Sequence, residues 1–248
     1  MFKSDESNIN MEFSSTGAEV NYQISIAHSE SDNKISILNA IFSNVVYLSI
    51  YRLAGSVINE PAGSILNWVT IMVSVIFVVL FFYVLKKLSH FSFEIFENIT
   101  LKNFMLAFGC AVLLFSINYA VNLLVIKNVF KSLYDILVAR HQYFLTFHSF
   151  LIACLLAPIG EELLFRGYIL KGLRNKHGTV VALLISTILF AISHVNIVSA
   201  TNAFIMGIVF GLLYIKRGPV FSCMLAHVIY NCMAVYVMNY YPYHLRLF

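Results

Sequence analysis

Long apolar stretches alternate with short polar connections along most of this chain. A helix needs about 20 consecutive apolar residues to cross a bilayer core, and the stretches have roughly that length. The pattern predicts seven spans, near residues 37–58, 65–85, 103–126, 145–172, 178–199, 202–216 and 219–239. Helices are expected rather than strands, because a lipid-facing strand leaves its backbone unpaired and no alternating barrel pattern occurs.

Composition supports the membrane assignment. The chain is 60% hydrophobic and only 11% charged, with a mean hydropathy of +0.81, whereas soluble domains carry about 25% charged residues. The four cysteines all lie in apolar segments without zinc or redox spacing, so they are interpreted as small packing residues. The sequence therefore predicts an all-α, polytopic integral membrane helical bundle.

The net charge of +4 lies in short basic clusters beside the apolar segments. Such clusters are typical of topology determinants, because cytoplasmic loops collect Lys and Arg, and no nucleic-acid partner is predicted. The loops 86–102, 171–178 and 216–219 are expected on the cytoplasmic side, with loop 127–144 opposite. Residues 1–35 form a polar N-terminal tail, expected in the cytoplasm, and residues 36–144 are predicted to be N-terminal transmembrane helices.

The stretch LLAPIGEELLFRGYIL, residues 155–170, places charges inside an apolar run. Glu161 and Glu162 are the only acidic residues after Asp135, and a charge at a helix centre costs roughly 2.5–3.5 kcal/mol on insertion scales. Glu162 and Arg166, four residues apart, share a helix face and can neutralise one another. Glu161 is then a second carboxylate without such a partner, and it lies about 100° from Glu162 around the helix axis.

Two later spans carry polar groups as well. His194 follows Phe190 by one turn, and His227 and Asn231 lie one turn apart on a common face. A lone intramembrane histidine is more often a satisfied contact between helices than a catalyst. Here, however, three spans carry such groups, and antiparallel packing brings them to similar depths in the bilayer. We therefore expect one buried polar site.

Two arrangements of this site fit the residues. Glu161 can act as a general base on water, with one histidine sharing the water and a His–Asn face donating to an oxyanion. Alternatively, Glu161, His194 and His227 can hold Zn²⁺ with water as the fourth ligand. Motifs of other membrane proteases are missing: there is no H-E-x-x-H, no Gly-x-Ser-Gly turn and no pair of membrane aspartates.

Taken together, Glu161-Glu162-x-x-x-Arg166, Phe190-x-x-x-His194 and His227-x-x-x-Asn231 resemble the motifs of the CPBP intramembrane endopeptidases. That family includes CAAX prenyl proteases and bacteriocin-processing "Abi" proteins. The resemblance covers about residues 145–240 and implies a catalytic membrane domain there, within about seven transmembrane helices and with a four-helix catalytic core.

The resemblance also implies roles for single residues. Glu161 would activate water with the help of His194, and His227 and Asn231 would polarise the carbonyl and hold the oxyanion. Glu162, Arg166 and Phe190 would orient these groups. The family has been described both as metalloproteases and as glutamate-type enzymes; we favour the glutamate type, which requires no cofactor, with zinc as the alternative.

The expected function is hydrolysis of a peptide bond in a small hydrophobic, leader-bearing or prenylated substrate at the lipid bilayer. A composition rich in Phe, Ile, Asn and Lys suits an AT-rich bacterial genome, so we expect the bacterial cytoplasmic membrane and a role in peptide maturation or self-immunity. The alternative is a non-catalytic peptide-binding or bacteriocin-immunity protein on the same scaffold. A proton-coupled transporter is disfavoured because no repeated halves occur.

Overall fold

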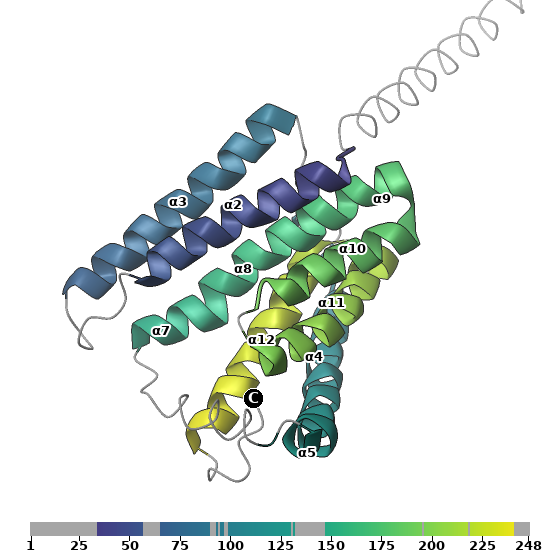
Figure 1. Cartoon of the computed structure of the whole chain (residues 1–248). Helices are drawn as coiled ribbons and strands as arrows, with labels where there is room; N and C mark the ends of the chain where they lie inside the picture. The colour runs from purple at the N-terminus through teal and green to yellow at the C-terminus, as the bar shows by residue number, and fades with distance from the viewer. Residues whose placement is uncertain are drawn as a thin grey trace, which may run out of the picture.

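The computed structural model describes residues 34–56, 65–89, 93, 95–96, 99–129, 131, 147–194, 196–217 and 219–240. Every regular element within these ranges is helical (Figure 1), which confirms the predicted all-α bundle. Residues 1–33 of the predicted N-terminal tail lie outside the described residues, and the division of the chain near residue 145 stays a prediction.

The described helices follow the predicted spans closely. The N-terminal ones are α2 (Ile37–Ser56), α3 (Ile65–Ser89) and α4 (Leu101–Val121), which continues through the π-helical η1 (Asn122–Ile126) and α5 (Lys127–Val129). A second continuous rod comprises α7 (Phe147–Leu151), η2 (Ile152–Leu156), α8 (Ala157–Glu162), η3 (Leu163–Leu170) and α9 (Lys171–His177). The last three helices are α10 (Thr179–Ile192), α11 (Ile197–Arg217) and α12 (Val220–Tyr240).

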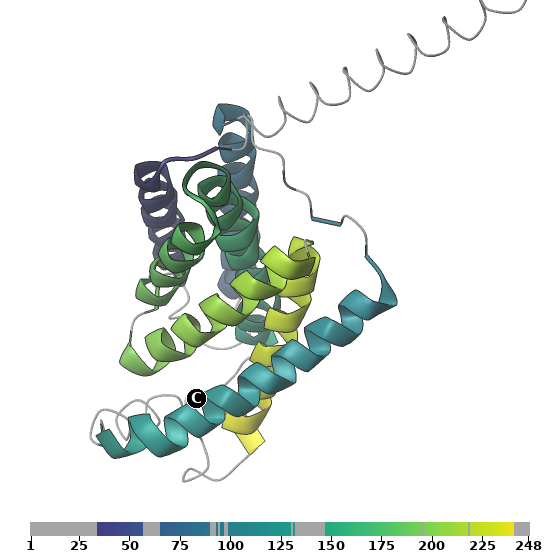
Figure 2. The ribbon, with the colours of Figure 1, turned by 90° about the vertical axis from the view of Figure 1, so that its right-hand side faces the viewer.

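Among the residues that the structure describes, three segments are long and apolar enough to cross a membrane, namely Leu101–Val129, Ile197–Lys216 and Val220–Val237. Ile37–Ser49 and Thr179–Ile192 are shorter apolar helices. Large apolar side chains are exposed along α3 and α4, as on Met72, Val79 and Met105; a lipid environment accounts for such a surface. Figure 2 shows α4, in teal, crossing α12, in yellow, and α4 packs against both α12 and α11.

The boundary between the fifth and sixth predicted spans was wrong. We expected spans at 178–199 and 202–216, but α10 already ends at Ile192 and α11 begins at Ile197. Capping explains the break: Ser193 Oγ donates to the Leu189 carbonyl at 2.7 Å, and Asn196 Oδ1 accepts the Ser199 N–H at 2.9 Å. His194 therefore lies just beyond a helix end instead of inside a helix.

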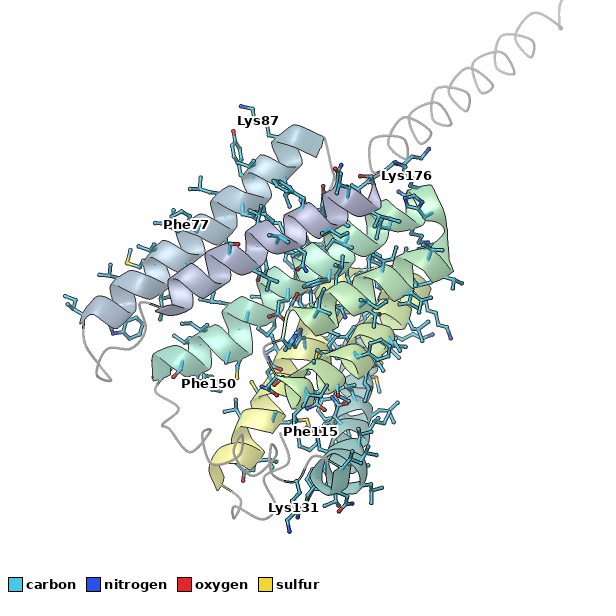
Figure 3. All side chains as sticks on the ribbon, viewed as in Figure 1. Phe77, Lys87, Phe115, Lys131, Phe150 and Lys176 are labelled. Carbon is cyan, nitrogen blue, oxygen red and sulfur yellow. The ribbon has the colours of Figure 1, made fainter. Side chains whose placement is uncertain are left out.

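Lysines from the basic loops 86–102 and 171–178 lie at one end of the bundle, and a lysine of the loop 127–144 lies at the other. Figure 3 shows Lys87 and Lys176 at the same end and Lys131 at the opposite end. The turn after α9 lies at the first of these ends, where Gly178 has φ +83° and its N–H donates to the Arg174 carbonyl at 3.1 Å. This left-handed residue reverses the chain, so that α9 and α10 are antiparallel, as the site prediction required.

Helix α2 and the residues just before it contact both α9 and α10, the two helices that this turn joins. Near its N-terminal end, the Ile35 N–H donates to the Gly172 carbonyl at 3.2 Å. Farther along, the Asn44 amide donates to the Leu189 carbonyl at 3.4 Å and accepts the Ser193 hydroxyl at 3.2 Å. One turn later the Tyr47 hydroxyl lies against Gly160. One face of α2 therefore touches both the helix that carries Glu161 and the end of α10.

Helices α10 and α11 approach closely at Gly207. A Cβ added there would lie 2.9 Å from Thr187 Cγ2 and 3.1 Å from Thr187 Cα. Close backbone approach at small residues is a common mode of helix packing in membranes. This contact lies one residue from Met206, which borders the site described below.

We expect Gly207→Ala to destabilise the protein, because the added methyl group must push α10 and α11 apart at a cost of about 1–3 kcal/mol. Gly109→Ala is the matched control: nothing lies within 4 Å of its added Cβ, so better helix propensity should raise stability by about 0.5–1 kcal/mol. Thermal unfolding in the same detergent micelle compares the two. Equal shifts in the unfolding temperature would contradict the close-packing argument.

Candidate functional site

The helix that carries the acidic pair is wound unevenly on both sides of it. The π-helical segments η2 and η3 flank α8, whose last two residues are Glu161 and Glu162. Pro158 lies in α8 and has no N–H to donate, which loosens the preceding turn. Single π-turns inside α-helices occur frequently at functional sites. The irregular helical winding and the buried charges therefore occur in the same segment of the chain.

Glu162 is the centre of a buried ionic network. Its Oε1 accepts from Arg166 Nη1 at 3.1 Å and from His227 Nδ1 at 2.8 Å. Glu162 and Arg166 are 0% and 1% exposed, so their charges must compensate one another. Glu162 Oε2 has no hydrogen-bond partner within the described part of the chain. The predicted pairing of Glu162 with Arg166 is present, and His227 joins it.

Aromatic rings and a backbone carbonyl enclose the guanidinium of Arg166. Its Nη2 donates to the Met206 carbonyl at 3.4 Å. Its Cζ lies 4.7 Å from the ring centroid of Phe190 and 5.8 Å from that of Phe210, within the range of cation–π attraction. The Phe190 ring also makes edge contacts with His194 and His227, at centroid distances of 5.1 and 6.0 Å.

His227 connects the two carboxylates. A carboxylate oxygen accepts only, so the Nδ1 that faces Glu162 carries the proton. When the ring is neutral, Nε2 is therefore its unprotonated nitrogen, and this atom lies 3.9 Å from Glu161 Oε2. That distance is too long for a hydrogen bond, and a polar gap of this size is one that a single water can bridge. The Glu161 side chain is 18% exposed, so it borders an accessible space.

His194 has the same tautomer by the same reasoning. Its Nδ1 lies 3.0 Å from the Phe190 carbonyl, which can only accept, so Nδ1 carries a proton, and in the neutral ring Nε2 is the acceptor. Both His227 and His194 lie close enough to Glu161 to interact with it electrostatically, and His227 is the stronger partner. The structure thus brings the predicted groups of three helices together.

Asn231 lies one turn after His227 and is oriented by a backbone group. Its Nδ2 donates to the Ala153 carbonyl in η2 at 2.7 Å. One of its two amide hydrogens is used in this bond, and the other remains for a ligand. Asn231 is half-buried. Its predicted place beside His227 is present, and its role as an oxyanion donor stays a prediction.

The zinc alternative needs three ligand atoms gathered around one point. Tetrahedral zinc with bonds of about 2.0–2.1 Å holds its ligand atoms roughly 3.3 Å apart, whereas Glu161 Oε2 and His227 Nε2 are 3.9 Å apart. No group of three His, Cys, Asp or Glu side chains among the residues that the structure describes is placed to hold a metal. The side chains as they stand do not fit a zinc ion, so no step below passes through one.

Sequence reasoning missed two features near the site. Phe210 and the Met206 carbonyl complete the enclosure of Arg166, but a phenylalanine and a methionine in an apolar helix carry no chemical signal. A polar cluster also joins α4 and η1 to α11 and α12. Its bonds run from Asn118 to the Tyr230 hydroxyl at 2.8 Å and from Asn122 to Asn202 Oδ1 at 3.1 Å. Asparagines four residues apart in an apolar span were the available signal.

Comparison with known proteins gives one match. Residues 143–233 match the family model described as "Type II CAAX prenyl endopeptidase Rce1-like". No curated protein and no solved structure matches the chain. The match confirms the resemblance that the three motifs predicted, and its range contains all of Glu161, Glu162, Arg166, Phe190, His194, His227 and Asn231.

Proposed function

We propose, from the premise that residues 143–233 are a region of the CAAX prenyl endopeptidase type, that this chain is an intramembrane endopeptidase in which Glu161 activates water. One observation carries the proposal most. Glu162 is fully buried, and its Oε1 is held by both Arg166 and His227, whereas Glu161 lies at an accessible edge and faces His227 Nε2 across a gap of 3.9 Å. The first carboxylate orients the site, and the second is left for chemistry.

The proposed reaction begins with water in the gap between Glu161 and the histidines. Glu161 takes one proton from the water, and the unprotonated Nε2 of His194 accepts the second O–H as a hydrogen bond. The water oxygen forms a bond to the scissile carbonyl carbon. When the C–N bond breaks, Glu161 returns its proton to the leaving nitrogen. No proton is gained or lost overall, and no covalent enzyme intermediate forms.

The oxyanion requires donors that face the carbonyl oxygen. Asn231 has one amide hydrogen left after its bond to Ala153. His227 donates from Nε2 only when it is protonated, and the Glu162 carboxylate at Nδ1 stabilises that imidazolium form. His227 is buried, with Phe190 and Phe210 beside its ring, so a charge interaction there is weakened little by solvent.

The substrate class that we propose is an apolar peptide, either prenylated or with a hydrophobic leader. An apolar groove of about 390 Å³ lies between α12 and α4, and Phe115, Cys232 and Met233 are among its lining residues. Cys232 follows Asn231 in the sequence but lies about 100° farther round the helix, so we propose that a hydrocarbon chain binds in this groove while the attached peptide passes round α12 to the site. A role in bacterial peptide maturation or self-immunity belongs to the same proposal.

The deciding experiment uses the full chain, purified and reconstituted into lipid vesicles. Farnesylated CAAX-type peptides, their unprenylated forms and hydrophobic leader peptides are incubated with wild type and with Glu161→Ala, and the products are measured by mass spectrometry. Cleavage by wild type alone is the expected result. If neither protein cleaves any peptide but both bind them, the non-catalytic binder is the correct function.

Metal dependence is tested on the same vesicles. We expect elemental analysis to find less than one equivalent of zinc, and activity to persist after dialysis against a chelator. Stoichiometric zinc that is lost together with activity, and restored together with it, would replace the glutamate mechanism with a metal-assisted one.

A further inference from the structure

The bond between Asn231 and Ala153 exists because the helix of Ala153 cannot use that carbonyl itself. In an α-helix the Ala153 carbonyl would accept the N–H of residue 157, and in a π-helix that of residue 158. The Ala157 N–H donates to the Ile152 carbonyl instead, and residue 158 is proline, which has no N–H. Both intrahelical donors are therefore missing.

An unpaired carbonyl inside a membrane protein must find another donor, because no lipid group can supply one. Asn231 from α12 supplies it, with Nδ2 at 2.7 Å from the carbonyl oxygen. Since a carbonyl only accepts, the contact also fixes which end of the amide is nitrogen. The amide is planar, so its second N–H and its oxygen then have set directions. His227, one turn earlier on the same helix, is anchored separately by Glu162.

We propose that Pro158 is a positioning residue for this site: by withholding an N–H from Ala153, it keeps a backbone carbonyl open that holds the Asn231 amide in its working orientation. The proposal rests on the proposed function, because the orientation matters only if Asn231 faces a reacting carbonyl. Pro158 touches no reacting atom. It acts through Ala153 and Asn231.

The competing explanation is that the bond only fastens α12 to η2. The two explanations differ in their response to a restored N–H. Pro158→Ala gives the rod back a donor and allows residues 152–158 to wind as an α-helix, which satisfies Ala153 internally. Asn231 then loses its anchor while the rod gains a hydrogen bond. Positioning therefore predicts lower turnover in a protein of equal or greater stability, whereas fastening alone predicts lower stability.

The test is a double-mutant cycle in reconstituted full-length protein. Pro158→Ala should lower kcat about 10-fold with KM changed less than about twofold, since the freed amide hydrogen still lies near the carbonyl; complete removal of such a donor costs about 10²–10³-fold. In an Asn231→Ala background, Pro158→Ala should have no further effect on kcat. The unfolding temperature of Pro158→Ala should equal or exceed that of wild type.

Controls separate the possible outcomes. Pro219→Ala, at the residue immediately before α12, removes a proline where no intrahelical N–H is required, and should keep wild-type kcat. Pro158→Ser restores the N–H with a different side chain and should reproduce the loss. Full kcat in Pro158→Ala, an equal loss in both Asn231 backgrounds, or a lower unfolding temperature for both Pro158 variants would each overturn the proposal.

A measurement without substrate distinguishes this proposal from the proposed function. In protein labelled with ¹⁵N-asparagine, the Asn231 side-chain amide signal, assigned by its loss in Asn231→Ala, should shift in Pro158→Ala and stay in place in Pro219→Ala. If the signal shifts but wild type cleaves no peptide, the anchoring is correct and the endopeptidase assignment is not. If wild type cleaves and the signal does not move, the positioning role is wrong.

Discussion

Glu161→Gln should abolish peptide cleavage, with kcat reduced about 10³-fold or more, because an amide cannot take a proton from water and general acid–base catalysis contributes about 10²–10⁴-fold. Gln has the same shape, and Glu161 takes part in none of the short contacts that fix Glu162. The unfolding temperature in detergent should therefore stay within about 2 °C of the wild-type value, since none of the mechanisms that cause large destabilisation, such as a cavity or a stranded charge, is introduced. Initial rates on one prenylated peptide measure the loss.

This substitution also separates the two neighbouring carboxylates. If Glu161→Gln cleaved at the wild-type rate, the base would have to be another group, and the division of roles between Glu161 and Glu162 would be wrong. Loss of activity together with a large drop in unfolding temperature would show instead that Glu161 is structural. Only loss of turnover in an intact protein agrees with the proposed mechanism.

Arg166→Met should destabilise the protein by about 3–5 kcal/mol, because it leaves the Glu162 charge buried without its cation. Arg166 is the largest of the fully buried side chains in the described part of the chain. The substitution also removes the guanidinium that lies over Phe190, while methionine keeps most of the apolar volume. Denaturant or thermal unfolding in micelles is the measurement.

A second substitution tests the cause of this loss. Glu162→Gln in the Arg166→Met background removes the stranded charge and still offers His227 an acceptor oxygen, so it should restore a large part of the lost stability. Equal instability of the single and the double variant would show that the packing of Arg166, and not its charge, accounts for the effect. Unchanged stability of Arg166→Met would contradict the network altogether.

Much of this molecule is predictable from periodicity and isolated charges. The apolar runs predict the helices, because in a membrane each span must satisfy its own backbone. The pairing of Glu162 with Arg166 follows from their spacing of four residues. Glu161 is then the carboxylate of this segment that has no cation at that spacing. Charges are scarce in this part of the chain, so each one carries information.

The remaining features depend on tertiary contacts that no local pattern contains. The break between Ile192 and Ile197 was not predicted, because the flanking apolar residues form one nearly continuous run, although Asn196 and Ser199 are a recognisable N-terminal capping pair. The π-helical segments coincide with Pro158 and with donors on other helices, such as Ser186, which donates to the Phe165 carbonyl at 2.9 Å. Helical periodicity cannot predict these partners, because they are distant in the sequence.

The contact between α2 and the Glu161 helix has a consequence for sequence divergence. A Cβ at Gly160 would lie 2.5 Å from the Tyr47 hydroxyl oxygen, so positions 47 and 160 share one volume, although only position 160 lies in the segment that matches the family model. Related chains with a larger residue at 160 should have a smaller one at 47. The residue at position 47 in the N-terminal helices would then change together with the residue at position 160 in the matched region. Chimeras that combine the N-terminal helices of one relative with the matched region of a distant one should fold poorly unless both positions come from the same relative.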